Sequence, residues 1–484
     1  MVTMYEKLAA MIETSIKCGI HLPGEKIASV RQCAQQQNLS ITTVLRAYLL
    51  LESKGLIESR PQSGYFVRAQ VGTLKEIPFK TVKPDPVSAE VGVSRLVLST
   101  LRSIGADAAV PLGSPYPDPS LFPLLRLNQH SNSISRRHQH WSLMEDLPPG
   151  NRELIRQIAR RYLESAFPVD PGEIIITVGA TEAINLCLQA VAKPGDVIAV
   201  ESPTYYANLH AIERMGMRAI EVETDHENGI NLDALSDVLS TQKVAACMVM
   251  PNFQNPLGFE MPDEKKRQLV ELLAERGIPV IENDVYRELH FGEVAPTSLK
   301  TYDKHGLVLH CSSFSKSLAP AYRIGWAMPG RYHAEVERLK FLNTLTTPSF
   351  PQRAIAEFMK YDGYDMHLRR VRRRLAQRAK IMTCVVKRFF PPGTQVSVPK
   401  GGYVLWVGLP GSVDAMKLYQ EALRDGITVG PGHMFSTTEN YKNCIRLNYS
   451  FPWSNEIEEA LIKVGRLASF LCGHNAKRKE DSLL

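Results

Sequence analysis

Long apolar runs and paired cysteine motifs are both missing from this chain of 484 residues. No segment approaches the ~20 apolar residues that a membrane-spanning helix needs, and the amino terminus lacks the basic and apolar regions of a signal peptide. Without any Cys-x-x-Cys motif, the eight cysteines are scattered over positions 18, 33, 187, 247, 311, 384, 444 and 472. We therefore expect a cytoplasmic protein with reduced thiols, without disulfides and without a metal site.

The composition is that of a folded protein with a basic surface. Hydrophobic residues make up 44% of the chain, which is enough for more than one core. A net charge of +7 and a pI near 8.8 suit a protein that binds nucleic acid. The basic run at residues 369–374 is expected to be a solvated helix face rather than a second site for DNA.

The most informative segment spans residues 310–326, where an apolar strand leads into a hydroxyl-rich turn. The turn contains Lys316, and Arg323 follows seven residues later. A lysine in such a turn suits an amine nucleophile for an aldehyde, while the hydroxyls and the arginine suit a nearby anion. The pattern therefore indicates a lysine that binds pyridoxal 5'-phosphate (PLP), although a surface turn after a strand would look the same.

The turn resembles that of the fold type I aminotransferases, in which Ser-x-x-Lys precedes an arginine for the cofactor phosphate. The resemblance implies that Lys316 binds the aldehyde carbon and that Ser313 and Arg323 bind the phosphate. A second phosphate contact is expected where a strand breaks and a helix begins, because helix amino termini expose unpaired N–H groups. The residues at that helix start are Gly179, Ala180 and Thr181.

Three further matches follow in the order that this family shows. Tyr205, after a Pro turn, matches the aromatic residue that stacks on the pyridine ring. Asn255, in an Asn-x-x-Asn-Pro-x-Gly loop, matches the asparagine that bonds the phenolic oxygen of the cofactor. Arg446, in an apolar strand, matches the arginine that binds the substrate carboxylate in a bidentate manner.

One position departs from the family pattern. The family has Asp-x-x-Tyr, in which the aspartate protonates the pyridine nitrogen, but counting back from Tyr286 gives Asn283. Asp284 is one residue away and would point to the opposite face of a strand. Either a local bulge brings Asp284 to the ring nitrogen, or the nitrogen meets an amide and the cofactor is a weaker electron sink.

The first 70 residues form a different pattern. Residues 5–17 have helical spacing, a Pro-Gly turn follows, and a second short helix is expected after Ser29. Ser40 is a capping residue before a third helical segment at 41–52. Two short apolar runs around a Gly turn then predict a β-hairpin that ends near Val67.

This order resembles the winged helix-turn-helix of the GntR regulators, which places the third helix in the DNA major groove. Some GntR proteins have arginines in that helix where this chain has Ile41 and Leu45, and Arg46 is displaced by one position. The residues that the resemblance assigns to DNA are Ser29, Arg31, Ser40, Thr42, Thr43, Arg46, Arg60, Ser63 and Gly64.

The charge of this module is modest. Residues 1–70 contain eight Lys or Arg and five Asp or Glu, which gives a net charge of +3. Phosphate attraction per module is therefore weak, and useful affinity would need two modules at one site. The remaining alternative is a small helical domain for protein interaction.

The two halves together resemble the MocR subgroup of GntR regulators, whose aminotransferase-like domain senses an effector and forms the dimer. The implied fold class is α/β: a winged helix-turn-helix at residues 1–70 and a PLP domain at 108–472 with a smaller α+β subdomain. Residues 71–107 are expected to be a linker and residues 473–484 a polar tail.

Two functions are compatible with this organisation. The first is a homodimeric, PLP-dependent transcriptional regulator that binds an operator and responds to an amino compound or to PLP itself. The second is an active aminotransferase with a secondary DNA-binding module. Asn283 argues for the first, because a missing acid weakens transamination. The sequence identifies neither the effector nor the operator.

Overall fold

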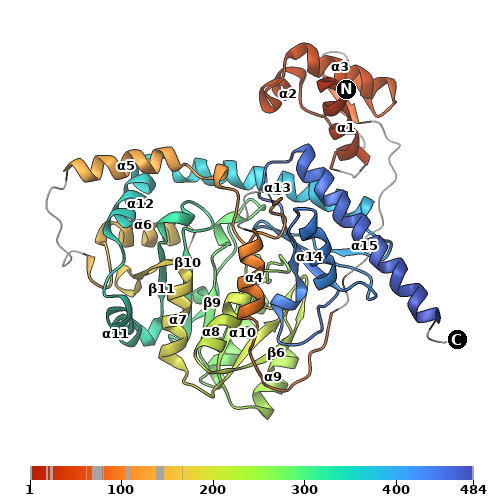
Figure 1. The fold of residues 1–484 in the computed structure, drawn as a ribbon. Coiled ribbons are helices and arrows are strands. Elements are labelled where there is room, and N and C mark those ends of the chain that lie inside the picture. Colours follow the sequence, from red (N-terminus) through yellow and green to blue (C-terminus); the bar gives the residue numbers. More distant parts are fainter. Residues whose placement is uncertain are drawn as a thin grey trace.

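The computed structural model describes residues 3–17, 20–21, 25–60, 63–67, 79, 81–104, 109–137, 146–165 and 167–481. Over these residues the chain forms a small domain and a larger one, with the small domain beside helices α13 and α15 (Figure 1). Among the described helices, none is long and apolar enough to span a membrane.

The small domain is a winged helix-turn-helix, as the sequence predicts. Its elements are α1 (Met4–Lys17), α2 (Val30–Gln37), α3 (Ile41–Ser53) and the antiparallel hairpin of β1 (Ile57–Arg60) and β2 (Gly64–Val67). The buried face of α3 packs on α1 and α2, and the hydroxyl of Tyr48 donates to the Ala28 carbonyl at 2.7 Å. This bond fixes α3 against the segment that precedes α2.

The large domain is built on a nine-stranded sheet in the order β3-β6-β5-β8-β9-β10-β11-β4, with β7 paired to β6. Strands β6, β5, β8, β9 and β10 are parallel, while β3, β11 and β4 run antiparallel to their neighbours. The strands are β3 (Ala89–Glu90), β4 (Ile175–Thr177), β5 (Val197–Ser202), β6 (Arg218–Asp225), β7 (Gly229–Ile230), β8 (Val244–Val249), β9 (Val280–Asn283), β10 (Val308–Ser313) and β11 (Gly325–Met328).

Helices cover both faces of this sheet (Figure 1), which explains why its central strands are apolar nearly throughout. In β9, Val280 packs in one apolar cluster with α10, whereas Ile281 packs in another with α7. The helices are α4 (Ser94–Ile104), α5 (Leu124–Arg137), α6 (Arg152–Leu163), α7 (Gly179–Val191), α8 (Tyr206–Arg214), α9 (Leu232–Thr241), α10 (Asp263–Glu275), α11 (His333–Thr344) and α12 (Ser349–Tyr361).

A smaller α+β subdomain follows in the chain. Its sheet has the order β12-β13-β15-β14, with β12 (Gln395–Val396), β13 (Val404–Gly408), β14 (Gly430–Pro431) and β15 (Cys444–Asn448). Its helices are α13 (Tyr364–Phe389), α14 (Ala415–Arg424) and α15 (Asn455–Asp481). Short 3-10 helices connect the elements: η1 (Pro119–Leu121), η3 (Pro171–Glu173), η4 (Arg287–Leu289), η5 (Leu299–Tyr302), η6 (Pro320–Tyr322), η7 (Gly330–Tyr332) and η8 (Gly432–Phe435).

The structure differs from the expectation of a linker at residues 71–107. Of this stretch, residues 81–104 are packed on the large domain: β3 extends the sheet through β6, and α4 packs against α8. The reason is that an exposed sheet edge and an amphipathic helix both gain stability from covering apolar surface. Residues 71–78, 80 and 105–107 lie outside the described part.

At the carboxyl-terminal end, α15 continues through Asp481, so the stretch predicted as a polar tail, 473–484, is helical as far as that residue. The basic run at 369–374 lies in α13, and the side chains of Arg369 and Arg370 are exposed, as predicted. Arg372 instead donates to the Glu288 carbonyl at 2.7 Å.

The start of α7 and the start of β11 approach each other closely. A Cβ atom on Gly325 would lie 2.5 Å from the carbonyl carbon of Gly179 and 2.7 Å from the amide nitrogen of Ala180. Gly179 itself has φ +75°, a conformation that residues with a side chain rarely adopt. Both glycines are therefore required for the contact between strand and helix.

We expect Gly325→Ala to lower the free energy of unfolding by about 1–3 kcal/mol, because the added methyl group must push α7 away from β11. Urea denaturation followed by circular dichroism measures the change. Gly411→Ala is the matched control: nothing lies within 4 Å of its Cβ position, so its effect should stay within about 0.5 kcal/mol. Equal losses in the two variants would contradict the packing argument.

Candidate functional site

The first part of the site is an anion cradle at the start of α7. No side chain caps this helix, so its first N–H groups remain available at Gly179, Ala180 and Thr181. The guanidinium of Arg323 lies beside them: a Cβ on Gly179 would be 2.5 Å from its Nη2. Arg323 Nη1 also donates to Ser315 Oγ at 3.2 Å. The amino terminus of α7, the guanidinium of Arg323 and the hydroxyl of Ser315 together suit the binding of a phosphate.

Ser313 belongs to the same part of the fold. It ends β10 and pairs with Gly325, the residue that touches Gly179. The structure thus brings the predicted phosphate ligands Ser313 and Arg323 to the start of α7. Ser315, which the sequence reasoning did not select, contacts Arg323 directly.

Lys316 lies in the turn after β10, between the two subdomains. Its Nζ donates to the Pro115 carbonyl at 3.1 Å and lies 5.3 Å from the centre of the Tyr116 ring and 5.7 Å from that of Tyr403. Burial, aided by the positive charge of Arg446, lowers the pKa of Lys316 from 10.5 to about 7. A large share of this amine is therefore neutral, and so nucleophilic, near neutral pH.

Asn255, Tyr286 and Tyr205 supply the amide and aromatic groups of the site. Asn255 Nδ2 donates to the hydroxyl of Tyr286 at 3.2 Å, and the Asn255 Oδ1 atom is buried without a partner. Tyr205 begins α8, and the side chain of Gln254 holds its loop by donating to the Pro203 carbonyl at 2.7 Å. Asn255 and Tyr205, 50 residues apart in the sequence, therefore lie on loops that are bonded to each other.

Arg446, on β15, supplies a buried cation at the other side. Its Nη2 donates to the Gly113 carbonyl at 2.8 Å, but Nε and Nη1 have no hydrogen-bond partner. The guanidinium lies 5.1 Å from the centre of the Phe435 ring and 5.9 Å from that of Tyr206. Two unpaired, buried donors on one guanidinium are costly unless an anion completes them, and a carboxylate has the matching geometry.

Asn283 and Asp284 point to opposite faces of the sheet. The pairing of β9 with β10 is regular from Val280 to Asn283, without a bulge. Since side chains alternate along a strand, Asn283 shares the α7 face with Ile281. Its Oδ1 is buried and unpaired. Asp284 faces the other way and accepts from Asn252 Nδ2 at 2.9 Å.

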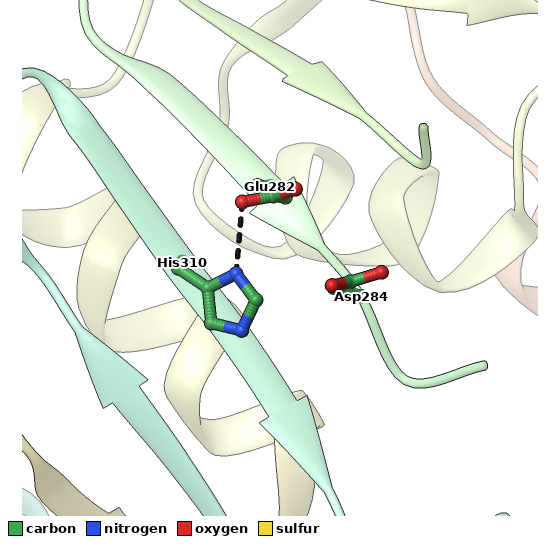
Figure 2. A group of neighbouring side chains, drawn as sticks. All are labelled: Glu282, Asp284 and His310. Carbon is green, nitrogen blue, oxygen red and sulfur yellow. Dashed lines mark hydrogen bonds and ion pairs between the residues drawn. The ribbon is translucent and has the colours of Figure 1, made fainter. Parts of the chain in front are cut away.

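Asp284 belongs to a buried polar network on the face of the sheet opposite Asn283. Figure 2 shows it beside Glu282 of β9 and His310 of the neighbouring strand. One carboxylate oxygen of each acid and one ring nitrogen of His310 lie within 4.8 Å of one another. His310 uses both ring nitrogens, Nδ1 with Glu282 at 2.8 Å and Nε2 with the Tyr162 hydroxyl at 2.7 Å. Burial and the charge of Glu282 raise the pKa of Asp284. Because His310 has no free nitrogen, the group is a hydrogen-bond network rather than a metal cage.

The residues present fit PLP. The cradle at Gly179 has no room for a Cβ, Lys316 is a half-buried amine of lowered pKa, and Asn255 and Arg446 hold unpaired buried polar atoms. These features would meet, respectively, a phosphate, an aldehyde, a phenolic oxygen and a carboxylate.

The small domain presents the predicted DNA-binding residues on α2, α3 and the hairpin. Two of them also have structural roles: Ser29 Oγ accepts from the Gln32 N–H at 3.3 Å, and Ser40 Oγ from the Thr43 N–H at 3.1 Å, which caps α2 and α3. The side chains of Arg31, Thr42, Arg46 and Ser63 are exposed, Thr43 is half-buried and Gly64 has φ +103°. The Arg60 side chain lies outside the described part.

Sequence reasoning missed the tyrosines around Lys316. Tyr116 and Tyr403 come from segments almost 300 residues apart. The hydroxyl of Tyr403 donates to the Pro115 carbonyl at 2.8 Å, the same oxygen that accepts from Lys316. Nothing local distinguishes these tyrosines from packing residues.

Comparison with known families agrees with the two-part geometry. Residues 4–67 match the model of bacterial regulatory proteins of the gntR family, and residues 139–464 match that of aminotransferase class I and II. The matches cover separate segments and leave the intervening chain between them. The amino-terminal match coincides with the winged helix-turn-helix.

Similar proteins include regulators whose match covers nearly the whole of both chains. YdcR of Escherichia coli (strain K12), described as an uncharacterized HTH-type transcriptional regulator, is 42% identical over 463 residues, 96% of this chain and 98% of YdcR. The HTH-type transcriptional regulator NorG of Staphylococcus aureus (strain USA300) is 28% identical over 442 residues, 91% of this chain and 98% of NorG. Both matches include the small domain.

Among solved structures, the alpha-aminoadipate aminotransferase LysN from Thermus thermophilus superposes with a TM-score of 0.71. It is 29% identical, and the match covers 77% of this chain and 95% of LysN. That crystal structure is a complex with N-(5'-phosphopyridoxyl)-L-leucine. The larger domain therefore has the fold type I aminotransferase architecture.

In protein freed of cofactor, we expect the reaction of Lys316 with a small aldehyde to follow a titration with its midpoint near pH 7. Only the neutral amine attacks, so the rate should rise from pH 6 and level off by about pH 8, whereas an ordinary lysine continues to gain reactivity toward its pKa of about 10.4. Reductive methylation with formaldehyde, followed by mass spectrometry of the peptide that contains Lys316, measures this.

The Arg446→Leu variant tests the cause. Removing that positive charge should move the midpoint upward, because a neighbouring cation disfavours the ammonium form. A rate that still rises between pH 8 and pH 10 in the unmodified protein would show that Lys316 titrates as an ordinary lysine.

Proposed function

Because the chain belongs to the GntR family of bacterial regulatory proteins and its larger domain to aminotransferase class I and II, we propose that it is a PLP-dependent transcriptional regulator of the MocR type. The observation that carries the proposal is a winged helix-turn-helix joined to a site in which two guanidiniums, the exposed Arg323 and the buried Arg446, both act on the pKa of Lys316. The small domain binds the operator and the large domain binds the effector.

In the proposed holoprotein the cradle of Gly179, Ser313 and Arg323 holds the PLP phosphate, and Asn255 and Tyr286 hold the phenolic oxygen. PLP supplies an aldehyde that captures amines and a ring that withdraws electrons. Lys316 provides the resident amine, and its neutral form at neutral pH favours capture of the aldehyde.

The effector we propose is an amino compound with a carboxylate, or PLP itself. A carboxylate would complete the unpaired Nε and Nη1 donors of Arg446. An amine on the same molecule would compete with Lys316 for the cofactor. The two arms of such an effector bridge the large sheet and the small subdomain, so the bound molecule biases their arrangement.

We further propose that the regulator is a homodimer. Three large apolar side chains close together in the sequence are exposed on and after α11: Phe341, Leu342 and Leu345. A folded protein rarely leaves several such side chains in water without a partner surface. A dimer also supplies the two DNA modules that a charge of +3 per module requires.

The proposed function predicts that PLP and an amino compound change DNA binding. Purified protein should retain a yellow cofactor, and borohydride should fix the cofactor on Lys316, because reduction makes the link permanent. Affinity for a duplex enriched from a random pool should then differ between protein with PLP alone and protein with added amino acids. Fluorescence anisotropy and peptide mass spectrometry are the measurements.

Lys316→Ala is the matched variant for this experiment. It should remain folded and bind DNA, but its affinity should no longer respond to the amino compound. Fixation of the cofactor on another lysine, or DNA binding that is identical with and without every ligand tested, would contradict the proposal.

The amide at Asn283 predicts a weak transaminase. If Asn283 meets the ring nitrogen, a neutral amide stabilises its protonated form less than a carboxylate would. Asn283→Asp should therefore speed conversion of bound PLP to pyridoxamine 5'-phosphate by about tenfold or more, which corresponds to a barrier change of about 1.4 kcal/mol. Stopped-flow absorbance after addition of an amino acid measures it.

Asp284→Asn is the control, because that side chain faces Glu282 and His310 instead of α7. It should leave the slow conversion unchanged within about threefold, a barrier change of less than about 0.7 kcal/mol. Ordinary turnover in the unmodified protein, of order 1–10³ per second, that is lost in Asp284→Asn would make Asp284 the acid and favour the aminotransferase function.

A further inference from the structure

The exposed face of α3 carries an aliphatic stripe. Ile41, Leu45 and Leu49 recur at every fourth position and are 54%, 41% and 51% exposed. The adjacent side of the helix faces the core of the domain, with Val44, Ala47, Tyr48 and Leu51 buried. The core of the domain therefore does not account for the three exposed aliphatic residues, because the helix already buries a separate apolar face.

Polar and basic groups surround the first part of this stripe. Ser40 and Thr42 lie at the start of the helix, 2.9 Å apart through their hydroxyl oxygens, and Arg46 is exposed beside Leu45. The first turn of α3 contains no acidic residue, and the sequence has none on this helix before Glu52. Two hydroxyls and one arginine, without a nearby acid, complement a polyanion, so they favour DNA over an apolar protein surface as the occupant.

The place of α3 in the domain determines what its exposed face meets. It is the second helix of the helix-turn-helix, the element that enters the major groove with its amino-terminal residues toward the base edges. Ile41 and Leu45 lie in the first two turns. Leu49 lies about 12 Å beyond Ile41 along the axis, from the 1.5 Å rise per residue, and so farther from the bases.

Base edges in the major groove offer donors, acceptors and one apolar group, the C5-methyl of thymine. Aliphatic side chains cannot bond a guanine O6 or a cytosine amino group and would leave them without water. Against a thymine methyl they bury apolar surface on both sides. On the basis of the DNA-binding function proposed above, we infer that Ile41 and Leu45 select operator half-sites by packing against thymine methyl groups.

The test uses the full-length protein with PLP and a duplex enriched from a random-sequence pool. In that duplex, each thymine is replaced in turn by uracil, which removes only the methyl group. At one or two positions per half-site the affinity should fall about fourfold, from the transfer free energy of one buried methyl. In Leu45→Ala, uracil at the position read by Leu45 should have no further effect, as a double-mutant cycle requires.

Three variants complete the design. Arg31→Ala, at the exposed start of α2, should weaken thymine and uracil duplexes equally, because a backbone contact carries no base information. Leu49→Ala should change affinity less than twofold. Leu45→Arg should enrich guanine where the unmodified protein enriches thymine, because arginine pairs with guanine O6 and N7. All the substituted side chains are exposed, so the variants should stay folded, and circular dichroism checks this.

The outcomes separate this inference from the proposed function. Failure to enrich any sequence would overturn DNA recognition as a whole. Enrichment of a sequence whose thymines all tolerate uracil within twofold would overturn methyl reading alone. If Ile41→Ala and Leu49→Ala instead change the sedimentation coefficient of the protein without altering DNA affinity, the stripe is an interface between copies, and the inference is wrong.

Discussion

The contact between Gly179 and Gly325 is the constraint on which the site depends. Because neither residue has a Cβ, the start of α7 lies against the start of β11 with backbone touching backbone. Arg323 precedes that strand by two residues, so the same contact places its guanidinium at the helix amino terminus. The turn that contains Lys316 connects β10 to η6, so the positions of these two elements determine where Lys316 lies.

Charge is distributed to receive two anions rather than one. Arg323 lies at the amino-terminal end of α7, where the helix dipole adds to its positive potential. Arg446 lies on the small subdomain with two unpaired donors, and both guanidiniums help to lower the pKa of Lys316. The two guanidiniums repel the ammonium form of Lys316. A bound phosphate and a bound carboxylate would each neutralise one guanidinium and so reduce this repulsion.

The sequence predicted those features that depend on local patterns. The cap at Ser40, the lysine turn and the opposite orientations of Asn283 and Asp284 follow from residue types and strand alternation. It could not predict that residues 81–104 pack on the sheet, since β3 finds its partner β6 more than 120 residues later. Nor could it predict that Tyr116 and Tyr403 lie beside Lys316, because only the folded chain brings these tyrosines close to it.

Phe79, which precedes β3 in the chain, contacts both subdomains of the large domain. Phe79 packs against β13, where a Cβ on Gly408 would lie 2.8 Å from its ring, and its ring centre is 5.5 Å from that of His226 beside β6. Strand β13 pairs with β15, and Trp406 lies opposite Arg446. Phe79 is thus held where the sheet that carries Arg446 meets the large domain. A shift of one sheet against the other must therefore change the contacts that Phe79 makes with both.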